Sequence, residues 1–305
     1  MASAVIKARR PGEPGLIEEA RELWRYRFLI RVLAERELRI RYKNSVLGIF
    51  WSMLAPLFQV FVMTIAVGYI MASGPSNLSS YILCAMLPWT FFQNAVLDSS
   101  TSVLQQLPLL KKVYFPREIP LLASVCANFV HFCMSLIVFV VYRWVITPII
   151  FGWPGPPPHE VLLLPLILLI QVALTTGVAF FVCALNVFYE DVKFVVTMTL
   201  QFLFYMLPIL YFSENIFFSN RIPNHQVRSW VYHLYLANPL AWLVTAYKQV
   251  FFTPQIITAR GVTPVIRSAP FDYRYMGIAA VISILICLAG YSYFNARKWK
   301  FTERP

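Results

Sequence analysis

The pattern of apolar and polar positions divides the chain into long uncharged runs separated by short polar segments. The first such run, residues 46–71, contains no charged side chain. As a helix rising about 1.5 Å per residue it would reach roughly 39 Å, enough to cross a bilayer core of about 30 Å with some tilt. Within lipid a helix also pairs its own backbone polar groups. This run predicts a first membrane span.

Five further apolar runs predict spans of the same kind. They cover residues 81–97, 119–145, 161–188, 194–212 and 277–294. Long continuous runs are typical of transmembrane helices, whereas barrel strands show short alternating segments. With 59% hydrophobic and only 13% charged residues, the chain is predicted to be an all-α, polytopic membrane protein with six transmembrane helices.

The connections between the predicted spans differ in composition. Residues 147–160 contain the run WPGPPP and are expected to form an extended outer loop, because proline disfavours helix. Residues 189–193 form a tight inner turn. In the long outer region 213–275, residues 239–252 are apolar but too short to cross alone. They predict a re-entrant or interfacial helix.

The basic residues indicate which side of the membrane holds the chain ends. The net charge is +12, and the basic residues that precede the first span are Lys7, Arg9, Arg10, Arg21, Arg25, Arg27, Arg31, Arg36, Arg39, Arg41 and Lys43. Arg297, Lys298, Lys300 and Arg304 follow the last span. Under the positive-inside rule both termini are cytoplasmic. Because the charge lies at membrane edges, nucleic acid is not an expected partner.

Three regions follow from this layout: a cytoplasmic segment 1–45, a six-span domain 46–294 and a cytoplasmic tail 295–305. Residues 16–28 alternate apolar and charged positions at helical spacing and predict an amphipathic helix. Trp24 and Arg25 are its interface residues. The pattern fits a helix lying on the membrane surface and equally one docking on a cytoplasmic subunit.

Several kinds of chemistry are missing from the sequence. It contains no glycine-rich phosphate loop ending in Lys and Ser or Thr, and the spans lack the buried acids from which ion-driven carriers build coupling sites. No His or Cys cluster has metal-ligand spacing, so no metal, cofactor or catalytic residue is predicted on this chain. The alternatives are a membrane-embedded glycan- or lipid-modifying enzyme, for which Arg221, His225 and Arg228 are the candidates, and a passive anchor.

Four ordered motifs resemble one family. The stretch RYKNSVLGIFWSMLAPLFQ (41–59), the loop LLKKVYFPREIP (109–120), the turn LNVFYEDVKFVV (185–196) and the NPL at 238–240 are similar to segments of ABC-2 type permeases that export polysaccharide. The resemblance covers most of the chain from about Arg39 to Phe252. One departure is Glu190, which stands where that family usually has a basic residue.

The resemblance implies partners and a location. Members of that family work as two copies of the permease with two copies of an ABC ATPase, so ATP and Mg would bind the partner chain. It implies a lipid-linked polysaccharide, such as an O-antigen, capsule or teichoic acid precursor, as substrate. The bacterial inner (plasma) membrane is the expected location, with membrane lipids around the chain.

A polar polymer needs a wide wet path, which dimerisation provides more readily than six helices alone. We expect the first and fifth spans to face each other across it. Aromatic residues there would offer flat faces to sugar rings, although aromatic residues also serve ordinary packing and interface belts. The candidate path residues are Trp51, Phe58, Phe61, Tyr69, Phe202, Phe204, Tyr205 and Tyr211.

The two inner connections are the candidate surfaces for an ATPase. Short charged turns that carry an aromatic residue suit a groove in a soluble partner, while contact with anionic lipid is the simpler alternative. The candidate coupling residues are Lys111, Lys112, Tyr114, Phe115, Arg117, Glu190 and Asp191.

Overall fold

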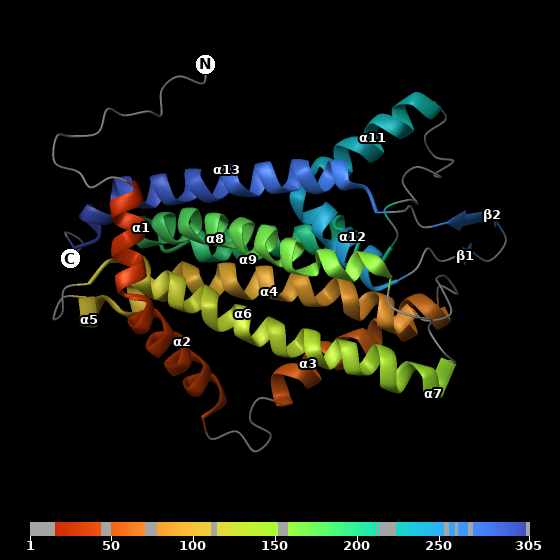
Figure 1. Ribbon diagram of the computed structural model, residues 1–305, viewed down its shortest axis with the longest axis horizontal. Coiled ribbons are helices and arrows are strands. Elements are labelled where there is room, and N and C mark those ends of the chain that lie inside the picture. The colour runs from red at the N-terminus through yellow and green to blue at the C-terminus, as the bar shows by residue number, and fades with distance from the viewer. Residues whose placement is uncertain are drawn as a thin grey trace.

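The computed structural model describes residues 16–43, 50–70, 78–110, 115–151, 158–211, 213, 224–252, 256–259, 262–267 and 271–302. Its long helices lie side by side along the longest axis of the molecule (Figure 1). The described elements, in chain order, are α1 (Leu16–Arg25), α2 (Arg27–Tyr42), α3 (Phe50–Thr64), η1 (Ile65–Ile70), α4 (Leu78–Gln105), α5 (Leu107–Leu110), α6 (Glu118–Val141), η2 (Tyr142–Ile146), α7 (Thr147–Phe151), η3 (His159–Leu163), α8 (Leu164–Phe188), α9 (Val192–Met206), α11 (His225–Ala237), α12 (Pro239–Phe251), β1 (Ile256–Ala259), β2 (Val262–Arg267), α13 (Tyr273–Arg297) and η4 (Lys298–Thr302).

The long helices alternate in direction, so the connections gather at two ends. One end, called here the α5 end, carries α1, α5 and η4 (Figure 1). There Lys298 forms a 2.8 Å ion pair with Glu118, and the rings of Phe188 and Phe301 lie 5.8 Å apart. The other, the hairpin end, carries α11 and the β1–β2 pair. The inner connections predicted from the sequence therefore lie at the same end as η4.

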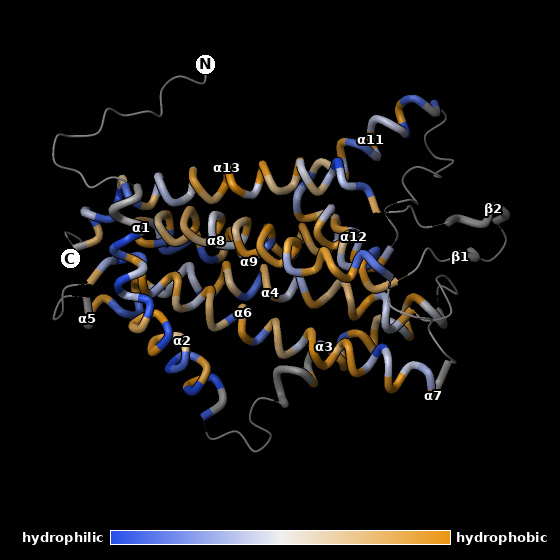
Figure 2. The backbone as a smooth tube through the Cα atoms, viewed as in Figure 1, coloured by the Kyte–Doolittle hydropathy of each residue, from blue (hydrophilic) through white to orange (hydrophobic). Residues whose placement is uncertain are grey.

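Three helices in the described part of the chain are long and apolar enough to cross a membrane. They span Glu118–Ile149, His159–Phe188 and Tyr273–Phe301, and two shorter apolar helices cover Pro56–Gly68 and Val192–Met206. Apolar residues fill the middle of the bundle, while hydrophilic residues concentrate on α1 and α2 (Figure 2). The prediction of an apolar helical bundle is confirmed, and six spans remain a prediction.

Several boundaries differ from those predicted. Helix α4 continues beyond residue 97 through the polar stretch to Gln105, where Ser100 and Ser102 donate to backbone carbonyls three residues earlier. Residues 147–151, expected to be extended, form α7. Pro148 lies shortly after the π-helical turn η2, near the end of a helix that runs without a break from Glu118 to Ile149. Residues 152–157 lie outside the described part.

The region between α9 and α13 holds the main departure from an all-α fold. Strands β1 and β2 pair antiparallel, with Ile256 opposite Arg267, and no strand was predicted here. Helix α12 matches the predicted short helix, and Asn238 caps its N-terminus by accepting from the backbone N–H of Leu240 at 3.0 Å. Its side chains are largely buried against α4, α8 and α13.

The charged N-terminal segment forms two helices where one was predicted. Helix α1 ends at Arg25, and α2 continues to Tyr42, well beyond the predicted end at residue 28. Leu33 and Ala34 of α2 are buried against α6. Trp24 is 70% exposed, and its role as an interface residue remains a prediction.

Two glycines bring α8 and α13 close together. A Cβ built on Gly290 would lie 2.1 Å from the carbonyl oxygen of Gly177, and one built on Gly177 would lie 2.6 Å from the backbone of Cys287. Small residues allow helix backbones to approach in this way. The contact fixes α13 against the centre of the bundle.

Candidate functional site

The predicted path residues on α3 and α9 form two exposed aromatic faces. Phe58 and Phe61 of α3 are 66% and 60% exposed, and Phe202 and Tyr205 of α9 are 63% and 72% exposed. Both helices pack on α4 and leave these residues uncovered within one chain. Large apolar surface of this kind is normally covered by lipid or by another protein surface.

The remaining path candidates have other positions. Phe204 points into the bundle, where its ring lies 6.1 Å from that of Trp89. Tyr211 donates to the carbonyl of Met206 and is 3.0 Å from the hydroxyl of Tyr235. These two residues therefore hold the end of α9 in place. The side chains of Trp51 and Tyr69 lie outside the described residues.

A buried lysine completes the attachment of α9. Lys248 of α12 is only 3% exposed. Its ammonium donates to the carbonyls of Pro208, Ile209 (3.3 Å) and Tyr211 (3.2 Å), and lies 4.1 Å from the ring centroid of Tyr81. These carbonyls belong to the non-helical segment that follows the end of α9 at Met206, and the buried ammonium satisfies them.

The candidate coupling residues at the α5 end divide into buried and exposed groups. Phe115 is 5% exposed and packs in a cluster with Leu33 of α2, so its ring anchors the connection to the chain's own helix. The guanidinium of Arg117 lies 5.6 Å from the ring of Trp299. Glu190 and Asp191 are exposed in the turn between α8 and α9. Lys111, Lys112 and Tyr114 lie outside the described residues.

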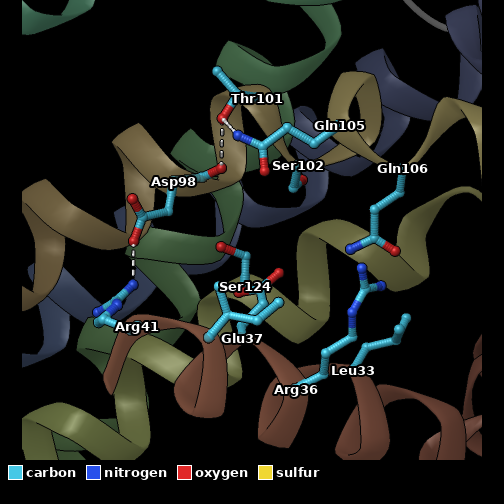
Figure 3. Close-up of a pocket in the computed structure, with 11 residues that line it drawn as sticks. Leu33, Arg36, Glu37, Arg41, Asp98, Thr101, Ser102, Gln105, Gln106 and Ser124 are labelled. Carbon is cyan, nitrogen blue, oxygen red and sulfur yellow. Dashed lines mark hydrogen bonds and ion pairs between the residues drawn. The ribbon is translucent and has the colours of Figure 1, made fainter. Parts of the chain in front are cut away.

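A polar network joins α2 to α4 and α6. Arg41 donates to the Asp98 carboxylate at 2.7 Å (Figure 3). It also donates to the Asn128 side-chain oxygen at 3.2 Å, and Asn128 donates to Asp98 at 2.9 Å. The three side chains therefore close a ring of hydrogen bonds between three helices. Charge-assisted bonds of this kind are stronger than neutral ones.

Beside this network lies a cavity of about 340 Å³ that Arg36, Glu37 and Gln106 also line (Figure 3). Burial, and to a lesser extent the nearby Asp98 carboxylate, raise the pKa of Glu37 from 4.5 to about 7. The neighbouring arginines and a hydrogen bond from Ser124 act in the opposite direction. Glu37 is thus close to half-protonated at neutral pH.

Comparison with known proteins shows the family. A model of the ABC-2 type transporter family matches residues 28–252. This chain belongs to the ABC-2 type transporter family. The match runs from α2 to α12 and so includes both aromatic faces, the polar network and Lys248. The members of this family are transport subunits, not enzymes.

Curated relatives of this ABC-2 chain resemble it over nearly its whole length. It is 28% identical to the O-antigen export system permease protein RfbA of Myxococcus xanthus over 94% of this chain and 99% of the relative. It is also 28% identical to the protein of the same name from Klebsiella pneumoniae, over 90% of this chain and 94% of the relative. The family and the apolar helices together indicate a multi-pass membrane protein.

The ABC-2 chain also contains site features that the sequence analysis missed. Arg41 was counted as positive-inside charge and as the first residue of the 41–59 motif, and Lys248 was not singled out within the apolar run 239–252 that contains it. The sequence did contain a signal that Arg41 faces the bundle. Leu33, Glu37 and Arg41 are spaced four residues apart and therefore share one face of a helix. No local pattern identifies the partners of Lys248, since its carbonyl acceptors lie 37 to 40 positions earlier.

The raised pKa of Glu37 predicts pH-dependent stability. Between pH 4.5 and about 7 the folded state binds more protons here than the unfolded state, so stability falls as pH rises through this window. Glu37→Gln should remove this loss and stabilise the protein at pH 8 by roughly 1–3 kcal/mol, with little effect at pH 4.5. Midpoints of thermal unfolding at both pH values measure the difference.

Glu35→Gln provides a matched control on the same helix. Glu35 is exposed and pairs with Arg31 at 2.8 Å. Its replacement should leave the pH dependence unchanged. Equal pH dependence in wild type and Glu37→Gln would contradict the assignment.

Proposed function

We propose that this chain is the membrane-spanning subunit of an ATP-driven exporter that moves a polysaccharide or lipid-linked glycan from the cytoplasmic side across the inner membrane. The observation that carries the proposal is its similarity, over nearly the full length of both chains, to proteins named O-antigen export system permeases. A separate ABC ATPase subunit hydrolyses ATP with Mg, because this sequence has no phosphate-binding loop of its own.

The proposal places six spans in the membrane with the α5 end in the cytoplasm. Helices α3 and α9 provide the first and fifth spans, and α4, α6, α8 and α13 provide the others. The basic residues of α1, α2 and η4 support this orientation, since positive charge concentrates on cytoplasmic segments. Helix α1 then lies at the cytoplasmic membrane surface or against a partner.

Two copies of the chain form the glycan path in this proposal. The exposed aromatic faces of α3 and α9 support it, because one chain leaves Phe58, Phe61, Phe202 and Tyr205 uncovered. Across a dimer these rings would offer flat surfaces to passing sugar residues. Such contacts bind many different sugars weakly, so a chain can slide along them.

The inner connections receive the force of ATP binding in the partner. Glu190 and Asp191 are exposed in the short turn between two long helices, where a groove of a soluble subunit can hold them. Phe115 supports the other connection from beneath through its contacts with α2. A displacement of either connection would be transmitted directly to a spanning helix.

Gene deletion tests the proposed function. Loss of the gene should remove a polysaccharide from the cell surface and leave its lipid-linked form inside the cell, and the wild-type gene should restore export. The tagged chain, purified from native membranes, should carry an ATPase in equal amount. Complementation with Asp191→Lys should lower export several-fold at normal protein level, because the reversed charge alters the proposed ATPase contact.

Gln226→Lys is the control for that variant, since it adds positive charge at an exposed position of the hairpin end. It should export like wild type. An unchanged surface polysaccharide after deletion, or purification without any ATPase, would contradict the proposed function. Normal export with Asp191→Lys would contradict only the coupling role of this turn.

A further inference from the structure

A second cavity lies at the hairpin end, and the residues that line it come later in the sequence than those of the polar network. It has a volume of about 400 Å³ and is enclosed by α11, α12 and the first turn of α13 with the two residues before it. Figure 1 shows these three elements meeting at the end of the bundle that also carries β1 and β2. Cavities of roughly 300–1,000 Å³ are typical of small-molecule sites.

Aromatic side chains supply much of the cavity wall. Trp242 of α12 is 2% exposed, and the ring of Phe271 meets it edge-on at 6.2 Å. Tyr273 packs edge-on against Phe271 at 5.2 Å and is itself 56% exposed. On the α11 side, Tyr232 is partly exposed. The cavity thus has a fixed aromatic floor and open tyrosine rings at its rim.

Polar groups accompany these rings. Asp272 and Arg274 line the cavity next to Tyr273, and Gln249 lines it from α12. One oxygen of Asp272 accepts from the backbone N–H of Arg274 at 2.9 Å, which fixes the carboxylate at the start of α13. A carboxylate accepts up to about four hydrogen bonds, so this group retains capacity to accept from a ligand hydroxyl.

The charges in this cavity balance. The residues that line the cavity include one acidic side chain, Asp272, and one arginine, Arg274. A site for a phosphate headgroup would instead concentrate cationic donors. Balanced charge beside aromatic rings fits a neutral ligand that has both an apolar face and many hydroxyl groups.

We propose that this cavity binds one or two sugar residues of the exported glycan at the hairpin end of the transporter. A pyranose ring presents a C–H face that can lie on Tyr273 or Tyr232, while its hydroxyls donate to Asp272 and accept from Arg274 and Gln249. The inference rests on the proposed function, which supplies a glycan as the ligand class. It adds a holding site outside the two aromatic faces of α3 and α9.

Direct binding to the permease–ATPase complex tests this site. The probe is the polysaccharide that the deletion strain fails to display, released from its lipid and tritium-labelled, and the assay is equilibrium dialysis in detergent. Tyr273→Ala and Tyr232→Ala should each weaken binding about 3–10-fold, the range expected for loss of one aromatic contact. Asp272→Asn should weaken it similarly while preserving the helix cap, because Asn caps as well as Asp.

Trp230→Ala is the matched control. Trp230 lies on the same helix as Tyr232 and is 77% exposed, but it does not line the cavity. Its loss should leave polysaccharide binding unchanged. If all three cavity variants bind the polysaccharide as tightly as Trp230→Ala does, the site is wrong and the proposed function stands.

Two other outcomes would also overturn the site. Competition by phosphatidylglycerol vesicles, with no displacement by excess unlabelled polysaccharide, would assign the cavity to a lipid headgroup. A deletion strain with an unchanged surface glycan would remove the proposed function and the site with it. Selective loss of binding in the cavity variants, with normal assembly with the ATPase, supports the proposal.

Discussion

Replacing Gly290 with alanine is expected to disrupt the packing of α13 on α8. The new Cβ would lie 2.1 Å from the carbonyl oxygen of Gly177 and 2.9 Å from its carbonyl carbon, which is far inside van der Waals contact. The obstructing atoms are backbone, so no side-chain rotation can relieve the clash. The two helices must separate over a long contact, and overpacking of this kind costs about 1–3 kcal/mol or more.

The experiment compares thermal unfolding of purified variants in detergent. Gly290→Ala should lower the unfolding midpoint clearly and reduce the yield of monodisperse protein, and Gly290→Val should do so more strongly. Gly277→Ala is the control in the same helix, because a Cβ there meets nothing within 4 Å. It should be neutral or stabilising by up to about 1 kcal/mol, the difference in helix propensity. A wild-type midpoint for Gly290→Ala would refute the close approach of these helices.

Replacing Lys248 with methionine is expected to release the end of α9. Methionine preserves most of the buried volume but removes the ammonium that donates to the carbonyls of Pro208, Ile209 and Tyr211. Each buried acceptor left unsatisfied costs about 1–3 kcal/mol. The segment after Met206 should therefore leave its position or admit water, and export should fall strongly.

Hydrogen exchange measures this release. Peptides covering residues 200–211 should exchange faster in Lys248→Met, whereas peptides from α8 should remain protected. Lys193→Met is the control, because it removes the same charge from an exposed position at the start of α9. Unchanged exchange in 200–211 would show that Lys248 does not hold this segment.

Hydropathy predicted the helical bundle because lipid imposes a strong and simple rule on composition. The long apolar runs became α6, α8 and α13, and the apolar run at 239–252 became α12. Helix α9 stops at Met206, short of the predicted end at residue 212, because Pro208 disfavours continuation of the helix. These features depend on local sequence alone.

The parts that the sequence did not predict depend on contacts between distant segments. Phe204 and Phe202 have the same composition signal, yet the first packs on Trp89 and the second is exposed. The polar residues after Leu97 read as a connection, but their hydroxyls bond back to the helix and α4 continues. Hydropathy could not distinguish these cases, because it does not specify which side of a helix faces the rest of the bundle.

The ion pair between Glu118 and Lys298 has a mechanical consequence. It is nearly buried, with the two side chains 3% and 15% exposed, and Arg117 lies over Trp299 beside it. This ion pair links the start of α6 to the turn that follows α13, although 180 positions separate the two residues in the chain. Under the proposed function, a displacement at this corner would act on α6 and α13 together, because the ion pair joins the start of one helix to the turn that follows the other.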